Sequence, residues 1–170
     1  QILQEAIRAN VKRFLYLSTF RVYGDTGDDI IRESLIPHPT HHYGITRLMA
    51  EHYVRHAGLK QHIKPVIVRL SNAFGSPVST DVDRWTLVFN DFCLQSIKTG
   101  QITIRSSGLQ HRDFIPIPDV THAIQLLLKT PDEKLKYDTY NLGSGTSMTI
   151  LEAAKLVKKV YSQILGKDIL

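Results

Sequence analysis

Tyr43 and Arg47 are the residues whose types and spacing most clearly suggest chemistry, in the run Tyr-Gly-Ile-Thr-Arg. Residues four apart on a helix project from one face, so the two side chains would lie together. A neighbouring cation favours the ionised form of a phenol. The hydroxyl of Ser18 or Thr19, which follow an apolar run, would complete a site for proton transfer. The spacing therefore predicts an acid/base site centred on Tyr43.

A strand and a helix would have to position these side chains. Residues 14–17, Phe-Leu-Tyr-Leu, predict a buried strand with Ser18 and Thr19 at its carboxyl end. A helix is predicted from about residue 42 to residue 57, and Gly58 suits its carboxyl end. The apolar residues of this helix fall on one side: Ile45, Leu48, Met49 and Tyr53.

The first half of the chain predicts a parallel α/β sheet. A first helix is expected to stop at Asn10, and Val-Ile-Val-Arg-Leu at residues 66–70 predicts a second buried strand. The order helix, strand, helix, strand is typical of parallel sheets, which bind ligands at the carboxyl ends of their strands. Ser18 and Thr19 fall at one such end, and Ser71 and Asn72 fall at another.

The second half predicts shorter elements. A helix is expected from about residue 85 to residue 98, with Gly100 ending it. Short strands are expected at residues 102–104 and 114–117, and Pro116 favours an edge or irregular strand for the latter.

Two polar residues in this half are expected to begin helices. Asp119 would cap one helix, and Thr149 with Glu152 forms a capping-box pattern at the start of the last one. The expected inward residues are Val120, Ala123, Ile124, Leu127 and Leu128 in the first, and Ala153, Val157, Val160 and Ile164 in the second.

The composition is that of a globular chain with a core. Of 170 residues, 42% are hydrophobic and 22% are charged, and no apolar run is long enough to cross a bilayer. The formal net charge of +5 comes from scattered Lys and Arg, without the basic stripe and interleaved aromatics that suit nucleic acid. The sequence therefore predicts neither a membrane span nor a nucleic-acid partner.

Cysteine and histidine usage favours neither a disulfide nor a metal. Cys93 is the single cysteine, which fits a reducing cytoplasm, and its apolar neighbours predict a buried side chain rather than a nucleophile. His38, His41 and His42 lie in a loop beside prolines, without the Cys or carboxylate cluster of a zinc site. No metal is predicted.

Five blocks between residues 11 and 152 resemble a known family in their order and letters. They are Phe14-Leu-Tyr-Leu-Ser-Thr-Phe-Arg-Val-Tyr-Gly24, Tyr43-x-x-x-Arg47-x-x-x-Glu51, Arg69-Leu-Ser-Asn-Ala-Phe-Gly75, Gly108-Leu-Gln-His-Arg-Asp-Phe-Ile115 and Tyr140-Asn-Leu-Gly-Ser-Gly145. Together they resemble the extended short-chain dehydrogenase/reductases, in particular the NAD-dependent nucleotide-sugar epimerases and dehydratases. Arg47 stands where that family has Lys.

The resemblance implies a role for each residue of the proposed acid/base site. Thr19 matches the hydroxyl that bonds the reacting sugar oxygen, with Ser18 as its neighbouring alternative. Tyr43 matches the general acid/base. Arg47 takes the place of the Lys that holds the nicotinamide ribose and lowers the pKa of the tyrosine, so Tyr43 and Arg47 are also expected to bind the cofactor.

The resemblance also implies binding roles at two later strand ends. Ser71 matches a position that lines the nicotinamide, Asn72 a contact to the sugar-nucleotide phosphates, and Arg112 the cation that pairs with the diphosphate. The residues themselves leave two alternatives open. Arg112 could form a salt bridge with Asp113 or Asp119, and Asn72 could be a strand-end turn residue.

The implied fold is α/β, the C-terminal part of a Rossmann-type parallel sheet with part of a small α/β substrate-binding domain. Residues 1–75 would be the second half of the NAD-binding domain, and residues 76–170 mostly substrate-binding, with elements that return to the Rossmann core. Gly143-Ser-Gly145 is not a dinucleotide fingerprint, because it lacks the third glycine. The chain is thus expected to be a fragment without the N-terminal phosphate loop, truncated at its C-terminus as well.

The implied activity is that of an epimerase, a 4-keto reductase or a dehydrogenase acting on a nucleotide-diphosphate sugar. Dehydratases of the family carry an acid directly after the hydroxyl pair, where this chain has Phe20 and Arg21. The alternative is a non-catalytic NAD- or nucleotide-sugar-binding homologue, weakened by Arg47. The resemblance implies NAD and leaves NADP open, implies a homodimer through the Tyr43 helix, and predicts no activity for the 170 residues alone.

Overall fold

The computed structural model describes residues 1–27, 30–79, 81–82 and 84–167, which divide into two units. Unit 1 comprises Gln1–Ser71 and Pro118–Gly143, and unit 2 comprises Asn72–Ile117 and Ser144–Leu170. Each unit is therefore built from two separate stretches of the chain, with one sheet in each.

The sheet of unit 1 is parallel, as predicted. Its strands are β1 (Arg13–Thr19), β2 (Lys64–Leu70) and β5 (Thr139–Leu142), in the order β1-β2-β5. Thr19 pairs with Leu70, so the carboxyl ends of β1 and β2 are level. The middle strand β2 is buried on both faces, since Val66, Ile67 and Val68 are all inaccessible to solvent. Its sequence therefore shows no alternation of apolar and polar residues.

The first strand forms as predicted but is less buried than expected. Phe14, Leu15 and Tyr16 are half-buried and Leu17 is 38% exposed, whereas the two polar residues that follow are buried. The reason is position, because β1 lies at one edge of the three-stranded sheet while β2 has a neighbour on each side.

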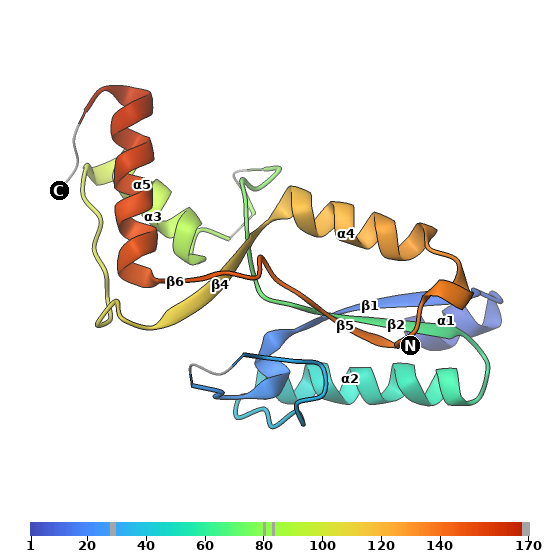
Figure 1. Cartoon of the computed structure of the whole chain (residues 1–170). Coiled ribbons are helices and arrows are strands. Elements are labelled where there is room, and N and C mark those ends of the chain that lie inside the picture. The colour runs from blue at the N-terminus through green and yellow to red at the C-terminus, as the bar shows by residue number, and fades with distance from the viewer. Residues whose placement is uncertain (28–29, 80, 83, 168–170) are drawn as a thin grey trace. The chain divides into compact units, whose positions relative to one another are not determined.

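Helices cover both faces of this sheet (Figure 1). On one face, α1 (Ile2–Arg8) and α2 (His42–Leu59) supply Leu3, Ile7, Val54 and Ala57 to a cluster around Ile67. On the other face, α4 (Ile117–Lys129) contributes Leu127 to a cluster around Val66 and Val68. Neighbouring residues of β2 thus pack against helices on opposite sides, as the pleat of a strand requires.

Two left-handed residues end the helices on the α2 side. Asn10 has a φ of 56° and ends α1 as predicted, and Gln61 has a φ of 58° just after α2. The prediction that Gly58 ends α2 is wrong, because it lies inside the helix. A Cβ at Gly58 would lie 2.6 Å from the ring of Pro65, so glycine there permits close packing.

The apolar side of α2 faces outward. Ile45, Met49 and Tyr53 are 41%, 54% and 68% exposed, so they do not belong to the core. The buried residues of the helix are Gly44, Glu51, Val54 and Ala57.

Unit 2 holds a mixed sheet, in the order β3-β4-β6. β4 (His111–Pro116) is parallel to β3 (Asn72–Phe74) and antiparallel to β6 (Ser147–Thr149). Of the two alternatives for the proline strand, the edge position is therefore wrong. The proline is the last residue of the middle strand, where a missing N–H is tolerated.

The other predictions for short elements were partly wrong. Residues 102–104 are not a strand, because the Thr103 N–H donates to Gln95 Oε1 and not to a neighbouring strand. Asp119 lies within the first turn of α4 and does not cap it, since the helix already begins at Ile117. Sequence patterning also missed β3, β5 and β6, and two short 3₁₀ turns, η1 (Phe20–Tyr23) and η2 (Asp132–Lys134).

The helices of unit 2 mostly follow the prediction. α3 (Val88–Thr99) starts later than expected and ends at Gly100, which is left-handed. α5 (Ile150–Leu165) begins with the predicted capping box, both halves of which are formed. α3 and α5 pack around Phe89, Phe92, Ala153 and Val157.

Three inward assignments on the helices do not hold. Val160 and Ile164 are exposed on α5, and Leu128 is exposed on α4, where only Val120 is buried. Cys93, predicted to be buried, is exposed. Partial desolvation of the Cys93 thiol still raises its pKa, which disfavours the nucleophilic thiolate.

Candidate active site

The carboxyl ends of β1 and β2 bring the first group of predicted residues together. Ser18 and Thr19 are buried at the end of β1, and Ser71 directly follows β2. The side chain of Thr19 accepts a hydrogen bond of 3.3 Å from the backbone N–H of Arg21 and so caps η1. Thr19 therefore marks the point where the strand turns away from the sheet.

The hydroxyl of Ser18 is already occupied by a buried carboxylate. Ser18 Oγ donates to Glu51 Oε1 at 2.5 Å, and Glu51 is completely inaccessible to solvent. Arg69 donates two hydrogen bonds to the same carboxylate, from Nε to Oε1 at 3.1 Å and from Nη2 to Oε2 at 2.7 Å. Burial alone would lower the pKa of the Arg69 guanidinium, but bonding to Glu51 and to Tyr23 raises it overall. Both oxygens of the buried carboxylate thus have hydrogen-bond partners.

Further residues extend this buried cluster. Arg55 Nη2 donates to Glu51 Oε2 at 3.2 Å and to Thr139 Oγ1 at 2.9 Å. The Arg69 guanidinium lies 4.7 Å from the centre of the Tyr23 ring, and Tyr23 Oη donates to Asn141 Oδ1 at 2.7 Å. The cluster therefore connects α2 to all three strands of unit 1 and to η1.

Tyr43 and Arg47 lie together near the start of α2, as their spacing predicted. The Arg47 guanidinium is 5.1 Å from the centre of the Tyr43 ring, while Tyr43 remains 52% exposed. Gly44 lets this end of the helix pack closely, because a Cβ there would lie 2.5 Å from the Arg21 carbonyl oxygen. The pair is therefore held against η1 and still open to solvent.

Arg47 has additional partners on β1 that the sequence did not reveal. Its Nη1 donates to Tyr16 Oη at 3.3 Å and to the Leu17 carbonyl at 3.4 Å. The hydrogen bond to Tyr16 raises the pKa of Arg47, opposed by partial burial and assisted by Tyr43. The guanidinium consequently bridges the helix and the strand.

Unit 2 holds the other two predicted residues. Asn72 Nδ2 donates to the Asp113 carbonyl at 2.8 Å, which ties β3 to β4. Arg112 Nη1 donates to the His111 carbonyl at 2.8 Å. The Asp113 carboxylate accepts bonds from the Ser144 N–H, the Ser144 hydroxyl and the Gly145 N–H, at 2.9, 3.1 and 3.0 Å. The Gly-Ser-Gly segment is thus a carboxylate-anchored turn.

The model of the NAD dependent epimerase/dehydratase family matches residues 1–143 of the sequence. The chain belongs to this family. The match includes all the predicted site residues, and it covers both stretches of unit 1.

Relatives within the epimerase/dehydratase family include both kinds of enzyme. The dTDP-D-glucose 4,6-dehydratase of Homo sapiens is 30% identical over 168 residues, which are 95% of this chain and 45% of that protein. The crystal structure of UDP-glucose 4-epimerase from Thermotoga maritima with UDP-glucose has a TM-score of 0.80 and 25% identity, covering 95% of this chain and 51% of that one.

A further solved member is UDP-glucuronic acid 4-epimerase from Bacillus cereus, in complex with UDP-glucuronic acid and NAD. Its TM-score is 0.77 at 26% identity, with 99% of this chain and 50% of that one covered. This chain spans about half the length of these relatives.

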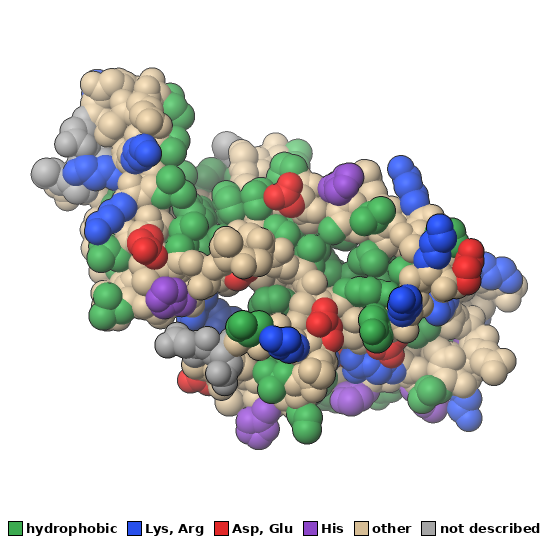
Figure 2. Space-filling model, in the orientation of Figure 1, with side chains coloured by type: hydrophobic (Ala, Val, Ile, Leu, Met, Phe, Trp, Pro, Cys, Tyr) green, Lys and Arg blue, Asp and Glu red, His purple; other side chains and the backbone are tan. Residues whose placement is uncertain are grey.

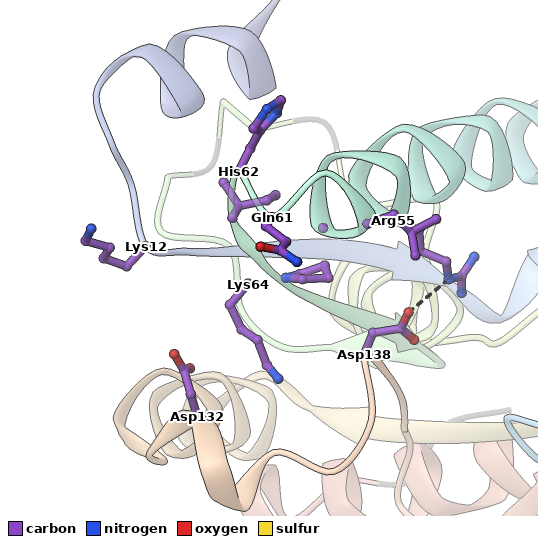
Figure 3. Close-up of a pocket in the computed structure, with 11 residues that line it drawn as sticks. Lys12, Arg55, Gln61, His62, Lys64, Asp132 and Asp138 are labelled. Carbon is purple, nitrogen blue, oxygen red and sulfur yellow. Dashed lines mark ion pairs between the residues drawn. The ribbon is translucent and has the colours of Figure 1, made fainter.

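One cavity of unit 1 lies away from the predicted site. A cavity of about 600 Å³ opens at the amino-terminal ends of β1 and β2 (Figure 3). Lys12 and Lys64 are on its wall, and Arg55 forms an ion pair of 3.5 Å with Asp138 beside it. The labelled cationic side chains point in different directions in Figure 3, so they do not converge on one ligand position.

Neither the distribution of charge on one face of the molecule nor a cluster of metal ligands marks a further site in the part of the chain that the structure describes. On the face shown in Figure 2, basic, acidic and apolar side chains are interspersed. Among the residues that the structure describes, no three His, Cys, Asp or Glu side chains gather as a metal centre would need. Within the same described parts, no helix is both long and apolar enough to span a membrane.

Sequence reasoning missed the buried cluster and Tyr16. Glu51 and Arg69 were noted only as letters of family blocks, although a signal was present. An Arg inside the apolar run of β2 would be buried, and a buried Arg nearly always has an acidic partner. No comparable signal marked Tyr16, because its hydroxyl finds Arg47 only through the packing of α2 on β1.

Proposed function

We propose that this chain is part of an NAD-dependent nucleotide-sugar epimerase in which Tyr43 acts as the general acid/base at a sugar hydroxyl. The observation that carries the proposal is the pairing of a half-exposed Tyr43 with the Arg47 guanidinium, 5.1 Å from the ring centre. A cation held there stabilises negative charge on the phenol as a proton leaves the sugar hydroxyl. Thr19 is proposed to bond the reacting oxygen, and the family membership and relatives support this reaction class.

The residues present fit the nicotinamide end of NAD. The hydrogen bonds of Arg47 to Tyr16 and Leu17 both use Nη1, which leaves further donors of the planar fork for ribose hydroxyls. Ser71 follows β2 at the sheet edge where parallel α/β folds bind dinucleotides. Bound NAD would supply a reversible hydride acceptor. Tyr43, Arg47 and Ser71 would orient it, and Tyr43 would hold the proton that is exchanged with the substrate.

Epimerisation is favoured over dehydration by the residues after Thr19. Loss of water needs an additional acid close to the sugar, and family dehydratases place it directly after the hydroxyl pair. Phe20 and Arg21 occupy those positions in η1 and offer no carboxylate. A 4-keto reductase or dehydrogenase would use the same residues. The human relative is named a dehydratase, so this difference in sequence separates the present proposal from that activity.

Substrate binding and assembly complete the proposal. Asn72 and Arg112 of unit 2 are proposed to bind the diphosphate of a nucleotide sugar, since both carry N–H donors. The exposed apolar stripe of α2, formed by Ile45, Met49 and Tyr53, is proposed to pack against a second copy of the protein. The single cysteine supports a reducing, cytoplasmic setting.

The second candidate is a binding protein without turnover. It is favoured by the hydrogen bond of Arg47 to Tyr16, which draws the guanidinium toward β1. A lysine at this position would be a shorter, freely rotating donor. If the arginine holds Tyr43 slightly out of place, the rate falls steeply while the fold and ligand binding remain.

Turnover of UDP-glucose and dTDP-glucose by the full-length protein tests both candidates. Tyr43→Phe is expected to lower kcat by roughly 10²–10⁴-fold because it removes the transferable proton. Tyr137→Phe, which deletes the hydroxyl of another exposed tyrosine in unit 1, serves as the control. A Tyr43→Phe variant as active as wild type would reject the acid/base role.

Arg47→Lys separates the candidates. An inactive wild-type protein that binds NAD and gains turnover with Arg47→Lys would establish the binding-protein alternative. An active wild-type protein whose activity requires Tyr43 would establish the epimerase.

A further inference from the structure

The completely buried Glu51 calls for a functional account, because charged side chains are rarely taken out of water. Its carboxylate accepts bonds from Ser18 on β1, Arg69 on β2 and Arg55 on α2. Ser18 and Arg69 are themselves paired across the two strands. One side chain of α2 therefore holds the carboxyl ends of both strands.

We propose that Ser18 and Glu51 are positioning residues that fix the distance between the Thr19 hydroxyl on β1 and the Tyr43 phenol on α2. This inference rests on the proposed function, since it assigns those two hydroxyls to the reacting sugar oxygen. It also moves Ser18 from a candidate substrate contact to a residue that acts through Thr19.

The alternation of a strand separates Ser18 from Thr19. Neighbouring side chains of a strand point to opposite faces, and Ser18 points to the face that α2 covers, where it meets Glu51. Its hydroxyl proton is donated to a carboxylate at 2.5 Å, a short charge-assisted bond. Ser18 therefore anchors the strand end, while the Thr19 side chain accepts a bond from the Arg21 N–H instead.

The same carboxylate fixes α2 along its axis. Glu51 lies eight residues after Tyr43, or about 12 Å along the helix at 1.5 Å per residue. The bidentate hydrogen bonding of Arg69 to Glu51 opposes both sliding and rotation of the helix over the strands. Tyr43 and Arg47, on the same rigid helix, keep their height relative to Thr19 as a result.

Stability alone does not explain a buried ion pair at this place. Apolar residues of similar size would usually give a fold at least as stable as a buried Arg–Glu pair does. What charged, directional bonds add is a unique register between elements. In an enzyme whose proton transfer depends on two hydroxyls from different elements, register controls the rate.

The test compares two losses of a buried hydroxyl in the full-length protein. Ser18→Ala breaks the strand-end anchor and leaves the Glu51–Arg69 pair in place. Thr139→Val is the control. It removes a hydroxyl at the start of β5 that accepts a hydrogen bond from Arg55 of the same cluster. Both are assayed for kcat and KM with UDP-glucose at a temperature where circular dichroism shows them folded, and for amide hydrogen exchange without added ligand.

Ser18→Ala is expected to lower kcat about 10- to 100-fold with KM changed less than about threefold, because reacting groups are misplaced rather than lost. Amides of residues 19–21 should exchange faster. Thr139→Val should keep kcat within about twofold of wild type, since it leaves the strand-end register intact.

Unchanged kcat and exchange in Ser18→Ala, beside an inactive Tyr43→Phe, would overturn the positioning role and leave the proposed function standing. A raised KM with unchanged kcat would also overturn it, by assigning Ser18 to direct substrate contact. If Tyr43→Phe is fully active, the proposed function itself fails.

Discussion

At the scale of single residues, Arg47 is defined by its partners as much as by its charge. It lies over the Tyr43 ring, and it donates to the Tyr16 hydroxyl and the Leu17 carbonyl. The i, i+4 spacing was sufficient to predict the pairing of Arg47 with Tyr43. The bonds to β1 depend on how α2 packs on the sheet, which no local spacing encodes.

Removing the Tyr16 hydroxyl should therefore matter only when arginine is present. Tyr16→Phe is expected to lower the free energy of unfolding by about 0.5–1.5 kcal/mol in wild type, because the partly buried guanidinium loses a hydrogen bond. In an Arg47→Lys background the same change should cost less. Urea unfolding of the four proteins of this double-mutant cycle measures the coupling. Equal costs in both backgrounds would show that Tyr16 does not hold Arg47.

At the scale of elements, sequence patterns predicted what adjacent residues decide. The parallel strands β1 and β2, the helix α2 and the capping box of α5 follow from apolar runs, spacing and local hydrogen bonds. The errors arose where distant partners decide. β1 is half-exposed because it is an edge strand, and residues 102–104 form no strand because Gln95 takes the Thr103 N–H. In the Glu51 cluster, Ser18 lies 33 positions before Glu51 and Arg69 lies 18 positions after it. Both separations are beyond any helical or strand period.

The capping box makes the start of α5 sensitive to acid. The backbone N–H and hydroxyl of Thr149 donate to the Glu152 carboxylate at 2.7 and 2.9 Å, and the backbone bond chiefly holds the pKa of Glu152 below its usual range. A carboxylate with a lowered pKa stabilises the fold above its unfolded-state pKa, and this contribution is lost as pH falls through the folded-state pKa. NMR titration should show the lowered pKa of Glu152.

Glu152→Gln is the matched variant for that prediction, because it keeps an acceptor while removing the ionisation. Its thermal unfolding midpoint should lose less on acidification than that of wild type. Identical acid dependence of the two proteins would contradict a contribution from Glu152.

At the scale of the whole molecule, the exposed stripe on α2 is the feature that a monomer leaves unexplained. Ile45, Met49 and Tyr53 repeat every four residues on the face opposite the Glu51 contact. Scattered apolar side chains are ordinary on a surface, but a continuous stripe on one helix suits a partner helix.

A charge at the centre of this stripe should separate two copies of the protein. Met49→Glu in the full-length protein is expected to shift sedimentation from dimer to monomer, because a carboxylate would be buried without a partner. Leu59→Glu, at an exposed site near the end of the same helix, is the control. A wild-type protein that sediments as a monomer, or a Met49→Glu variant that remains dimeric, would reject the stripe as the interface.

The division of each unit into two stretches has a consequence for how the chain acquires its structure during synthesis. The chain passes between the units after Ser71, after Ile117 and after Gly143. The sheet of unit 1 therefore cannot be completed until β5 has emerged, about 70 residues after β2, by which time much of unit 2 has already been made. Pairing over such separations is slow to form. The Glu51–Arg69 pair, only 18 residues apart, is positioned to hold α2 on β2 during that interval.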